Sequence, residues 1–185
     1  MNGAPGFKKW GDPVDREWKR DFLIWLGQQN NIRTVVETGT HMGGMSLELA
    51  PHFESIHTIE LSPIFYQRSK VILQDAKNVI QHLGSSRLIL EDVLKETTGS
   101  VLFWLDAHFS GGDTAHDGNP LPEELRTIMK SHPDSLIAID DMPGVNIEDS
   151  SELAGISFKG WHKEYWTGVV VMHKEGLYNI PPIEE

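Results

Sequence analysis

The sequence predicts one α/β domain of 185 residues, with a doubly wound, mostly parallel sheet of about seven strands and an antiparallel pair of strands at its C-terminal end. Short, β-branched apolar runs alternate with segments of helical periodicity, which is typical of βαβ units whose sheet is covered on both faces. A late Val-rich run, residues 169–171, is not followed by a helical pattern. We therefore expect this run to join the sheet as an antiparallel edge or hairpin.

The N-terminal part of the chain is expected to form a loose arm, residues 1–11, and then a helix over residues 12–31. Asp12 can cap this helix, and Pro13 suits its first position. Four apolar residues recur on one face of the helix: Trp18, Phe22, Trp25 and Leu26. That face is expected to pack on the sheet.

Strands and helices are expected to alternate through the core, residues 33–175. The expected strands are 34–36, 56–59, 87–90, 101–105, 136–139 and 169–173, with a shorter strand after the glycine turn that follows. The expected helices are 46–50, 63–84 and 122–129, with a helical turn around 149–153. Apolar periodicity and the Gly, Pro and Asn residues between the runs give these limits.

Composition argues against several classes of protein. The chain contains no cysteine, which rules out disulfides and thiolate zinc sites and fits a reducing, cytoplasmic location. No signal peptide and no membrane span are expected, since no apolar run is long enough. The formal net charge of −11 disfavours nucleic acid as a partner.

Acidic residues stand at the ends of the predicted strands, where a doubly wound sheet binds its ligands. They are Glu37, Glu60, Asp92, Asp106, Asp140 and Asp141. Any one of them could be a helix cap or a solvated turn residue. Their common position indicates a binding site at the carboxyl edge of the sheet.

The first strand leads into a glycine-rich turn, Glu37-Thr38-Gly39-Thr40-His41-Met42-Gly43-Gly44. The dinucleotide fingerprint needs a glycine where His41 stands, and no Gly-Lys-Ser/Thr ending of a phosphate loop follows. An acid before the turn suits a cationic amino group. The acid at the end of the next strand, Glu60, suits the two hydroxyls of a ribose.

The fourth and fifth predicted strands end in Asp106 and in the pair Asp140-Asp141. Three carboxylates that converge repel one another, and a hard divalent cation relieves this repulsion. Successive strand residues face opposite ways, so both members of the pair reach one ion only if the strand has ended. His108 could accept a proton there; the alternative is that it orders the loop after it.

The stretches VVETGTHMGG, HTIE and LEDV resemble motifs of the class I S-adenosylmethionine-dependent methyltransferases, with a departure at His41. WLDAH and IDDM resemble motifs of the metal-dependent, macrocin-type sugar and natural-product O-methyltransferases. The resemblance covers residues 33–175 and implies a Rossmann-like methyltransferase fold. It implies cofactor binding by Glu37, Thr38, Gly39, Thr40, Gly43, Glu60 on the ribose and Asp92 near the adenine. It also implies magnesium, or another divalent cation, on Asp106, Asp140 and Asp141.

The resulting expectation is O-methyl transfer from S-adenosylmethionine to a small hydroxylated acceptor such as a sugar or diol, with Asp106 and His108 as catalytic residues. The alternatives are a cofactor-binding module without activity, a partner-dependent subunit, and a homodimer that completes the site. An NAD-linked oxidoreductase or epimerase is disfavoured by His41, which stands where the dinucleotide fingerprint needs a glycine. Five scattered histidines are expected to be surface or packed residues rather than ligands: His52, His57, His82, His132 and His173.

Overall fold

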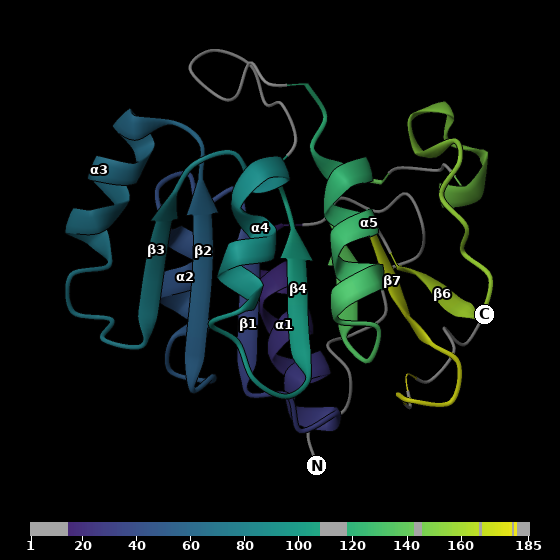
Figure 1. The fold of residues 1–185 in the computed structure, drawn as a ribbon. Helices are drawn as coiled ribbons and strands as arrows, with labels where there is room; N and C mark the ends of the chain where they lie inside the picture. The colour runs from purple at the N-terminus through teal and green to yellow at the C-terminus, as the bar shows by residue number, and fades with distance from the viewer. Residues whose placement is uncertain (1–14, 108–117, 143–145, 167, 179, 181–185) are drawn as a thin grey trace.

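The structure is a computed structural model that describes residues 15–107, 118–142, 146–166, 168–178 and 180. Within those residues one seven-stranded sheet has the order β3-β2-β1-β4-β5-β7-β6 (Figure 1). The strands are β1 Thr34–Thr38, β2 Ser55–Glu60, β3 Val79–Leu83, β4 Val101–Leu105, β5 Leu136–Ile139, β6 Trp161–Trp166 and β7 Val169–Lys174. The helices are α1 Arg16–Gln29, α2 Gly44–Leu49, α3 Pro63–Ile72, α4 Ser86–Leu94 and α5 Leu121–Ser131, with short 3-10 turns at Ile147–Asp149 and Ser151–Leu153.

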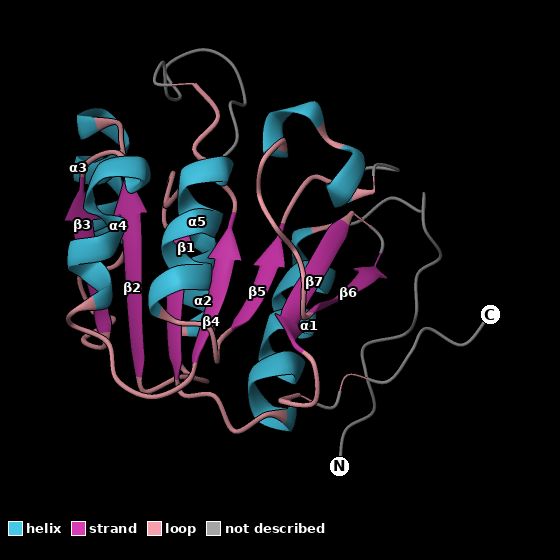
Figure 2. Cartoon of the chain, turned by 45° about the vertical axis from the view of Figure 1, so that its right-hand side comes forward, coloured by secondary structure: helices cyan, strands magenta, loops and turns pink. Residues whose placement is uncertain are grey.

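The sheet confirms the predicted architecture. Strands β1 to β5 are mutually parallel, and β7 pairs antiparallel with both β5 and β6. Helices α1 and α2 lie on one face and α4 and α5 on the other (Figures 1 and 2). The strand order reverses between β1 and β4, and a doubly wound sheet binds its ligands at such a point. Within the described residues, no helix is both long and apolar enough to cross a membrane.

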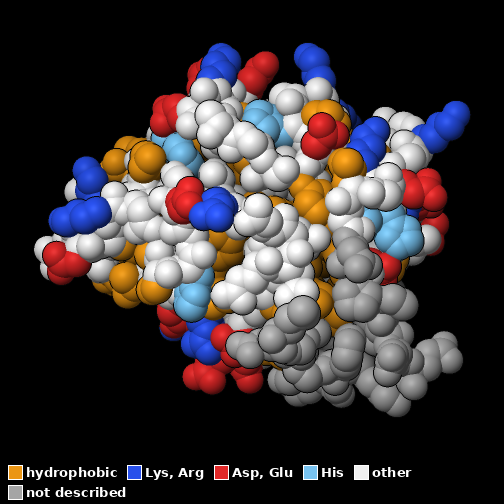
Figure 3. All heavy atoms as spheres, turned by 90° about the horizontal axis from the view of Figure 1, so that it is seen from below, with side chains coloured by type: hydrophobic (Ala, Val, Ile, Leu, Met, Phe, Trp, Pro, Cys, Tyr) orange, Lys and Arg blue, Asp and Glu red, His pale blue; other side chains and the backbone are white. Residues whose placement is uncertain are grey.

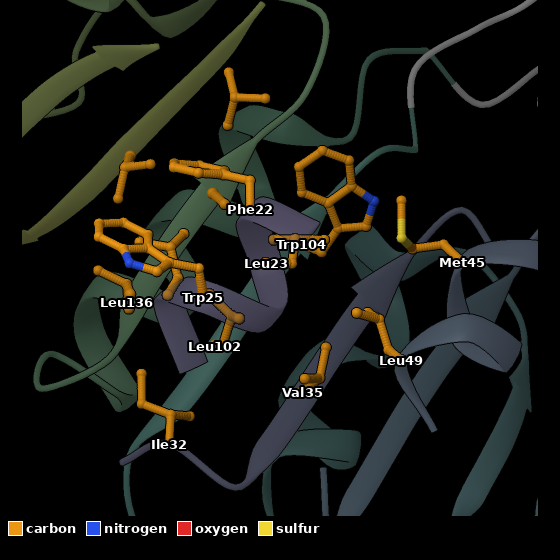
Figure 4. Close-up of a cluster of buried hydrophobic side chains, with 14 of the residues drawn as sticks. Phe22, Leu23, Trp25, Ile32, Val35, Met45, Leu49, Leu102, Trp104 and Leu136 are labelled. Carbon is orange, nitrogen blue, oxygen red and sulfur yellow. The ribbon is translucent and has the colours of Figure 1, made fainter. Parts of the chain in front are cut away.

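Helix α1 buries the apolar face that the sequence predicts (Figure 4). Phe22 is fully buried between the rings of Trp18 and Trp166, whose centroids lie 4.9 and 4.7 Å from its own. The helix begins later than expected, because Asp15 is the cap and accepts the N–H of Trp18 at 2.8 Å. The arm and the expected cap Asp12 lie outside the described residues.

The predicted third strand is wrong. Residues 86–94 form α4, and the strand is β3, within the segment expected to extend the preceding helix to Gly84. The chain leaves α3 at Ile72, and Asn78 anchors the following turn by donating to the carbonyls of Ala50 and Phe53. Leu90, Val93 and Leu94 are the buried large residues of α4, at the i, i+3 and i+4 spacing of a helix face.

The C-terminal strand pair is confirmed, but its order is not. The hairpin joins β6 to β7, so the extra strand precedes the Val-rich strand, and residues 175–177 after it form a turn. Strand β6 escaped prediction because His162, Lys163 and Glu164 interrupt its apolar pattern. Its terminal residues Trp161 and Trp166 are buried on opposite faces of the sheet.

Charged side chains lie at both edges of the sheet. Figure 3 views the molecule from below, onto the amino ends of the parallel strands, and shows acidic and basic side chains intermixed on that face. The described members of the acidic set at strand ends, except Asp92, lie at the opposite edge. The carboxyl edge of the sheet is therefore the candidate location of a binding site.

Candidate functional site

The strand register places Asp106 and Asp140 side by side. Leu105 of β4 is the partner of both Thr38 of β1 and Ile139 of β5, so the three strands end at the same level. The N–H of Asp106 donates to the carbonyl of Thr38 and that of Asp140 to the carbonyl of Leu105, each at 3.0 Å. Each aspartate is therefore held by the backbone of the neighbouring strand.

Asp141 completes a group of three carboxylates. One oxygen from each of Asp106, Asp140 and Asp141 lies within 4.8 Å of the others. The geometric objection raised by the sequence is resolved, because β5 ends at Ile139 and Asp141 adopts a left-handed backbone with φ of +50°. Its N–H donates to Oδ1 of Asp140 at 2.8 Å. We refer to these three residues as the carboxylate cluster.

Burial and mutual repulsion disfavour the charged forms of the carboxylate cluster. Burial, followed by the charge of Asp140, raises the pKa of Asp106. Burial also raises the pKa of Asp140, against the effect of Lys19. Asp141 is open to solvent, with 67% of its side chain exposed. Three carboxylate oxygens with one solvent-facing side fit Mg²⁺, which prefers oxygen ligands and keeps several of its waters.

Lys19 of α1 is a residue of this site that the sequence analysis missed. Its Nζ lies 2.6 Å from Oδ2 of Asp140 and 3.4 Å from Oδ1 of Asp141, and its side chain is 17% exposed. The sequence did hold a signal. Lys19 follows Trp18 and precedes Phe22 by three residues, which places a charge at the border of the buried stripe.

The glycine-rich turn after β1 presses against the end of β4. Gly39 has a φ of +90°, and a Cβ built there would lie 2.4 Å from the carbonyl oxygen of Asp106. The N–H groups of Gly39 and Thr40 donate to the carbonyl of Ile59, at 2.9 and 3.2 Å. Because a Cβ would clash with Asp106, only glycine fits at residue 39. The two hydrogen bonds to Ile59 attach the turn to β2 as well.

His41, the departure from the expected motif, takes the backbone conformation of a glycine. Its φ is +48°, and its N–H donates to Oε2 of Glu60 at 2.7 Å. The N–H of Ser62 donates to Oε1 of Glu60 at 2.8 Å. Each carboxylate oxygen has a further lone pair, so the buried Glu60 can still accept from a ligand diol.

Glu37 accepts hydrogen bonds that hold the residues around the glycine-rich turn together. Its Oε2 accepts hydrogen bonds from the hydroxyl of Ser46 and, at 2.6 Å, from that of Thr58. Thr40 is joined to the same network, since its hydroxyl lies 2.5 Å from that of Thr58. Burial raises the pKa of Glu37 to about 7, although the two hydroxyls act in the opposite direction. Gly43 ends the turn with a φ of +80°.

Asp92 does not lie where it was expected. It is on helix α4 instead of at a strand end, its side chain is 77% exposed, and it accepts from Lys95 at 2.6 Å. The carboxyl end of β3 is followed by Gly84 and Ser85, and the N–H of Gly84 donates to the carbonyl of Glu60 at 2.9 Å. Ser85 thus replaces Asp92 as the residue that follows the third strand. His108 lies outside the described residues.

Comparison with known proteins identifies the fold. No family model and no curated protein matches the chain. Among solved structures, the O-methyltransferase of Bacillus cereus in complex with SAH matches with a TM-score of 0.64 and 16% identity, over 93% of this chain and 84% of that one. The fold is that of the class I methyltransferases.

Other structures with this fold belong to different kinds of methyltransferase. The O-methyltransferase TomG of Streptomyces achromogenes, involved in tomaymycin synthesis and solved with SAM, has a TM-score of 0.61 and 19% identity over 89% of this chain and 82% of that one. An rRNA methylase from Streptococcus thermophilus has a TM-score of 0.51 and 14% identity over 88% and 99%. The methyltransferase fold therefore does not select the acceptor.

Proposed function

We propose that this protein is an S-adenosylmethionine-dependent methyltransferase that transfers the methyl group to a hydroxyl of a small acceptor, assisted by magnesium or a similar divalent cation. The observation that carries the proposal is the contact between Gly39 and the backbone of Asp106. It joins the glycine-rich turn to the carboxylate cluster. A methyl donor in the turn and an acceptor oxygen at the cluster would be neighbours, as in-line transfer requires.

The cofactor half of the site consists of residues already fixed by the backbone. The Glu60 carboxylate is held by two N–H donors and offers its remaining lone pairs to the ribose hydroxyls. Glu37 is proposed to face the methionine end of the cofactor, where the positive amino group would favour its ionised form. Thr38, Gly39, Thr40 and Gly43 would shape the turn around the same end. Ser85, rather than Asp92, is proposed for the adenine side.

The metal half of the site would be held by Asp106, Asp140 and Asp141. When bound, a divalent cation would lower the pKa of the acceptor hydroxyl. S-adenosylmethionine, when bound, would supply the methyl group to the acceptor oxygen, and S-adenosylhomocysteine would remain as the product. Asp106 orients the acceptor, and His108 is proposed to receive the hydroxyl proton.

A small diol or sugar is the acceptor class that suits a cation with solvent-facing positions, because two oxygens can bind side by side. The net charge of −11 favours such an acceptor over a polyanion. The alternative is a cofactor-binding module without activity, either alone or as a subunit that a partner or a second copy completes. Product formation separates the two.

The test is methyl transfer from labelled S-adenosylmethionine to a panel of catechols and sugars, with magnesium and with chelator. Wild type is expected to label an acceptor only with the metal, and Asp106→Asn is expected to lose activity. Asp92→Asn is the matched control, since Asp92 is an exposed acid on α4. Cofactor binding without product across the panel would support the binding module instead.

A further inference from the structure

Two histidines and a glutamate lie together at the edge of the sheet, outside the carboxylate cluster. One ligand atom from each of His57, His82 and Glu96 lies within 4.8 Å of the others. Nδ1 of His57 is 3.1 Å from Nε2 of His82, and the two rings are nearly parallel at 10°. Sequence reasoning treated both histidines as packed or surface residues.

Three separate elements bring these residues together. His57 is on β2 and His82 on the edge strand β3, where the register pairs His57 with Ile80 and Ile59 with His82. In a strand, side chains two residues apart lie on the same face, so His57 lies on the face of Ile59. His82 is the register partner of Ile59 and lies on that face too. Ile59 packs there against the buried residues of α4. Glu96 follows the end of α4, and its N–H donates to the carbonyl of Val93 at 3.0 Å. The arrangement is therefore a product of the tertiary fold.

The protonation states favour metal binding. Burial, followed by the charge of His82, lowers the pKa of His57, and burial also lowers the pKa of His82. A lowered pKa favours the neutral imidazole, which is the form that coordinates metal. The Glu96 carboxylate is exposed and supplies the negative charge. Two neutral imidazoles and one carboxylate form a donor set of zinc sites that keep their fourth position for water.

We propose that His57, His82 and Glu96 bind one divalent transition-metal ion of the zinc class. Two imidazole nitrogens on a tetrahedral zinc ion are separated by roughly 3.3 Å, given the usual zinc–nitrogen distance. The 3.1 Å between the histidine nitrogens is close to this separation. The exposed side of Glu96 leaves a coordination position for water.

The ion would tie the edge strand β3 to β2 and to the connection after α4. This site is chemically distinct from the carboxylate cluster, because nitrogen ligands select zinc-class ions and oxygen-only ligands select magnesium. The inference does not depend on the proposed methyl transfer.

Cobalt(II) is the probe, because tetrahedral cobalt absorbs strongly in the visible range and cobalt with oxygen ligands alone absorbs weakly. Wild type is expected to bind one equivalent with intense bands. Glu96→Gln is expected to weaken binding by at least about tenfold, since removal of a ligand costs more than the loss of an outer-shell partner. His82→Asn is expected to abolish the bands. Glu96 is exposed, so its variant should fold.

Two control variants locate the ion. Glu91→Gln, an exposed acid on α4, and Asp106→Asn, in the carboxylate cluster, should both retain the bands. Zinc should also raise the melting temperature of wild type and not that of His82→Asn. Weak bands in wild type, or bands that survive Glu96→Gln and His82→Asn unchanged, would overturn the proposal.

Discussion

The ammonium nitrogen of Lys19 lies 2.6 Å from Oδ2 of Asp140, so helix α1 supplies a cation to the end of strand β5. The contact links residues 121 positions apart in the chain. It offsets the repulsion among three carboxylates, which burial makes costly. A divalent ion at the carboxylate cluster would share Asp140 and Asp141 with this ammonium.

Replacement of Lys19 by methionine tests that competition. We expect Lys19→Met to bind Mn²⁺ several-fold more tightly than wild type, because the variant lacks a positive charge beside two ligands. We also expect the metal-free variant to unfold at lower denaturant, because a buried carboxylate loses its partner. Calorimetric titration with Mn²⁺ measures the first effect, and Lys130→Met, at an exposed position on α5, is the control. Equal or weaker Mn²⁺ binding by Lys19→Met would contradict the competition.

Alanine at Gly39 tests the contact between the turn and β4. Its φ of +90° disfavours any side chain, and its Cβ would meet the backbone of Asp106 at 2.4 Å. Gly155 has a similar φ of +85° with nothing within 4 Å, so Gly155→Ala measures backbone strain alone. We expect Gly155→Ala to lower the free energy of unfolding by about 1 kcal/mol and Gly39→Ala by clearly more, with loss of cofactor binding. Urea unfolding that gives equal losses for both would refute the close contact.

Glu124 gives the fold a dependence on pH. It is buried on α5, and burial raises its pKa from 4.5 to about 7, against the effects of Ser86 and Thr38. Between these pH values the unfolded state releases its proton and the folded state keeps it, so stability falls as pH rises. Above about pH 7 the full cost, of order 3 kcal/mol, is present.

Glu124→Gln removes this titration. We expect the variant to gain stability relative to wild type on going from about pH 5 to about pH 8, as measured by urea unfolding at both. Glu91→Gln, at an exposed position, should leave the pH dependence unchanged. A difference between Glu124→Gln and wild type that is the same at both pH values would show that the folded carboxyl titrates normally.

The sequence predicted those parts of the fold that depend on local pattern. Strand β4 was predicted with the limits that the structure shows, because a short, continuous apolar run that ends at Asp106 is typical of a buried strand. The segment around β3 was misread, because residues 79–90 offer apolar positions that fit either a strand or a helix, and only packing on β2 decides between them. Asp92 was misplaced as a consequence.

The candidate site was predicted as far as strand ends define it. Asp106, Asp140 and Asp141 converge because parallel strands end at one edge, which is a general property of the fold. Lys19 reaches them through the packing angle of α1, and the pair His57 and His82 depends on the register of β2 with β3. Neither the packing angle of a helix nor the register of two strands can be predicted from a local stretch of sequence.

Calorimetric titration with S-adenosylmethionine tests the central claim most directly. Wild type is expected to bind with micromolar affinity, and Glu60→Gln and Glu60→Ala are expected to lose at least about tenfold, because charged hydrogen bonds to the ribose are removed. Glu54→Ala, at an exposed acid just before β2, should bind as wild type does. No binding by wild type, with or without magnesium, or equal binding by the Glu60 variants, would contradict the assignment of this site to S-adenosylmethionine.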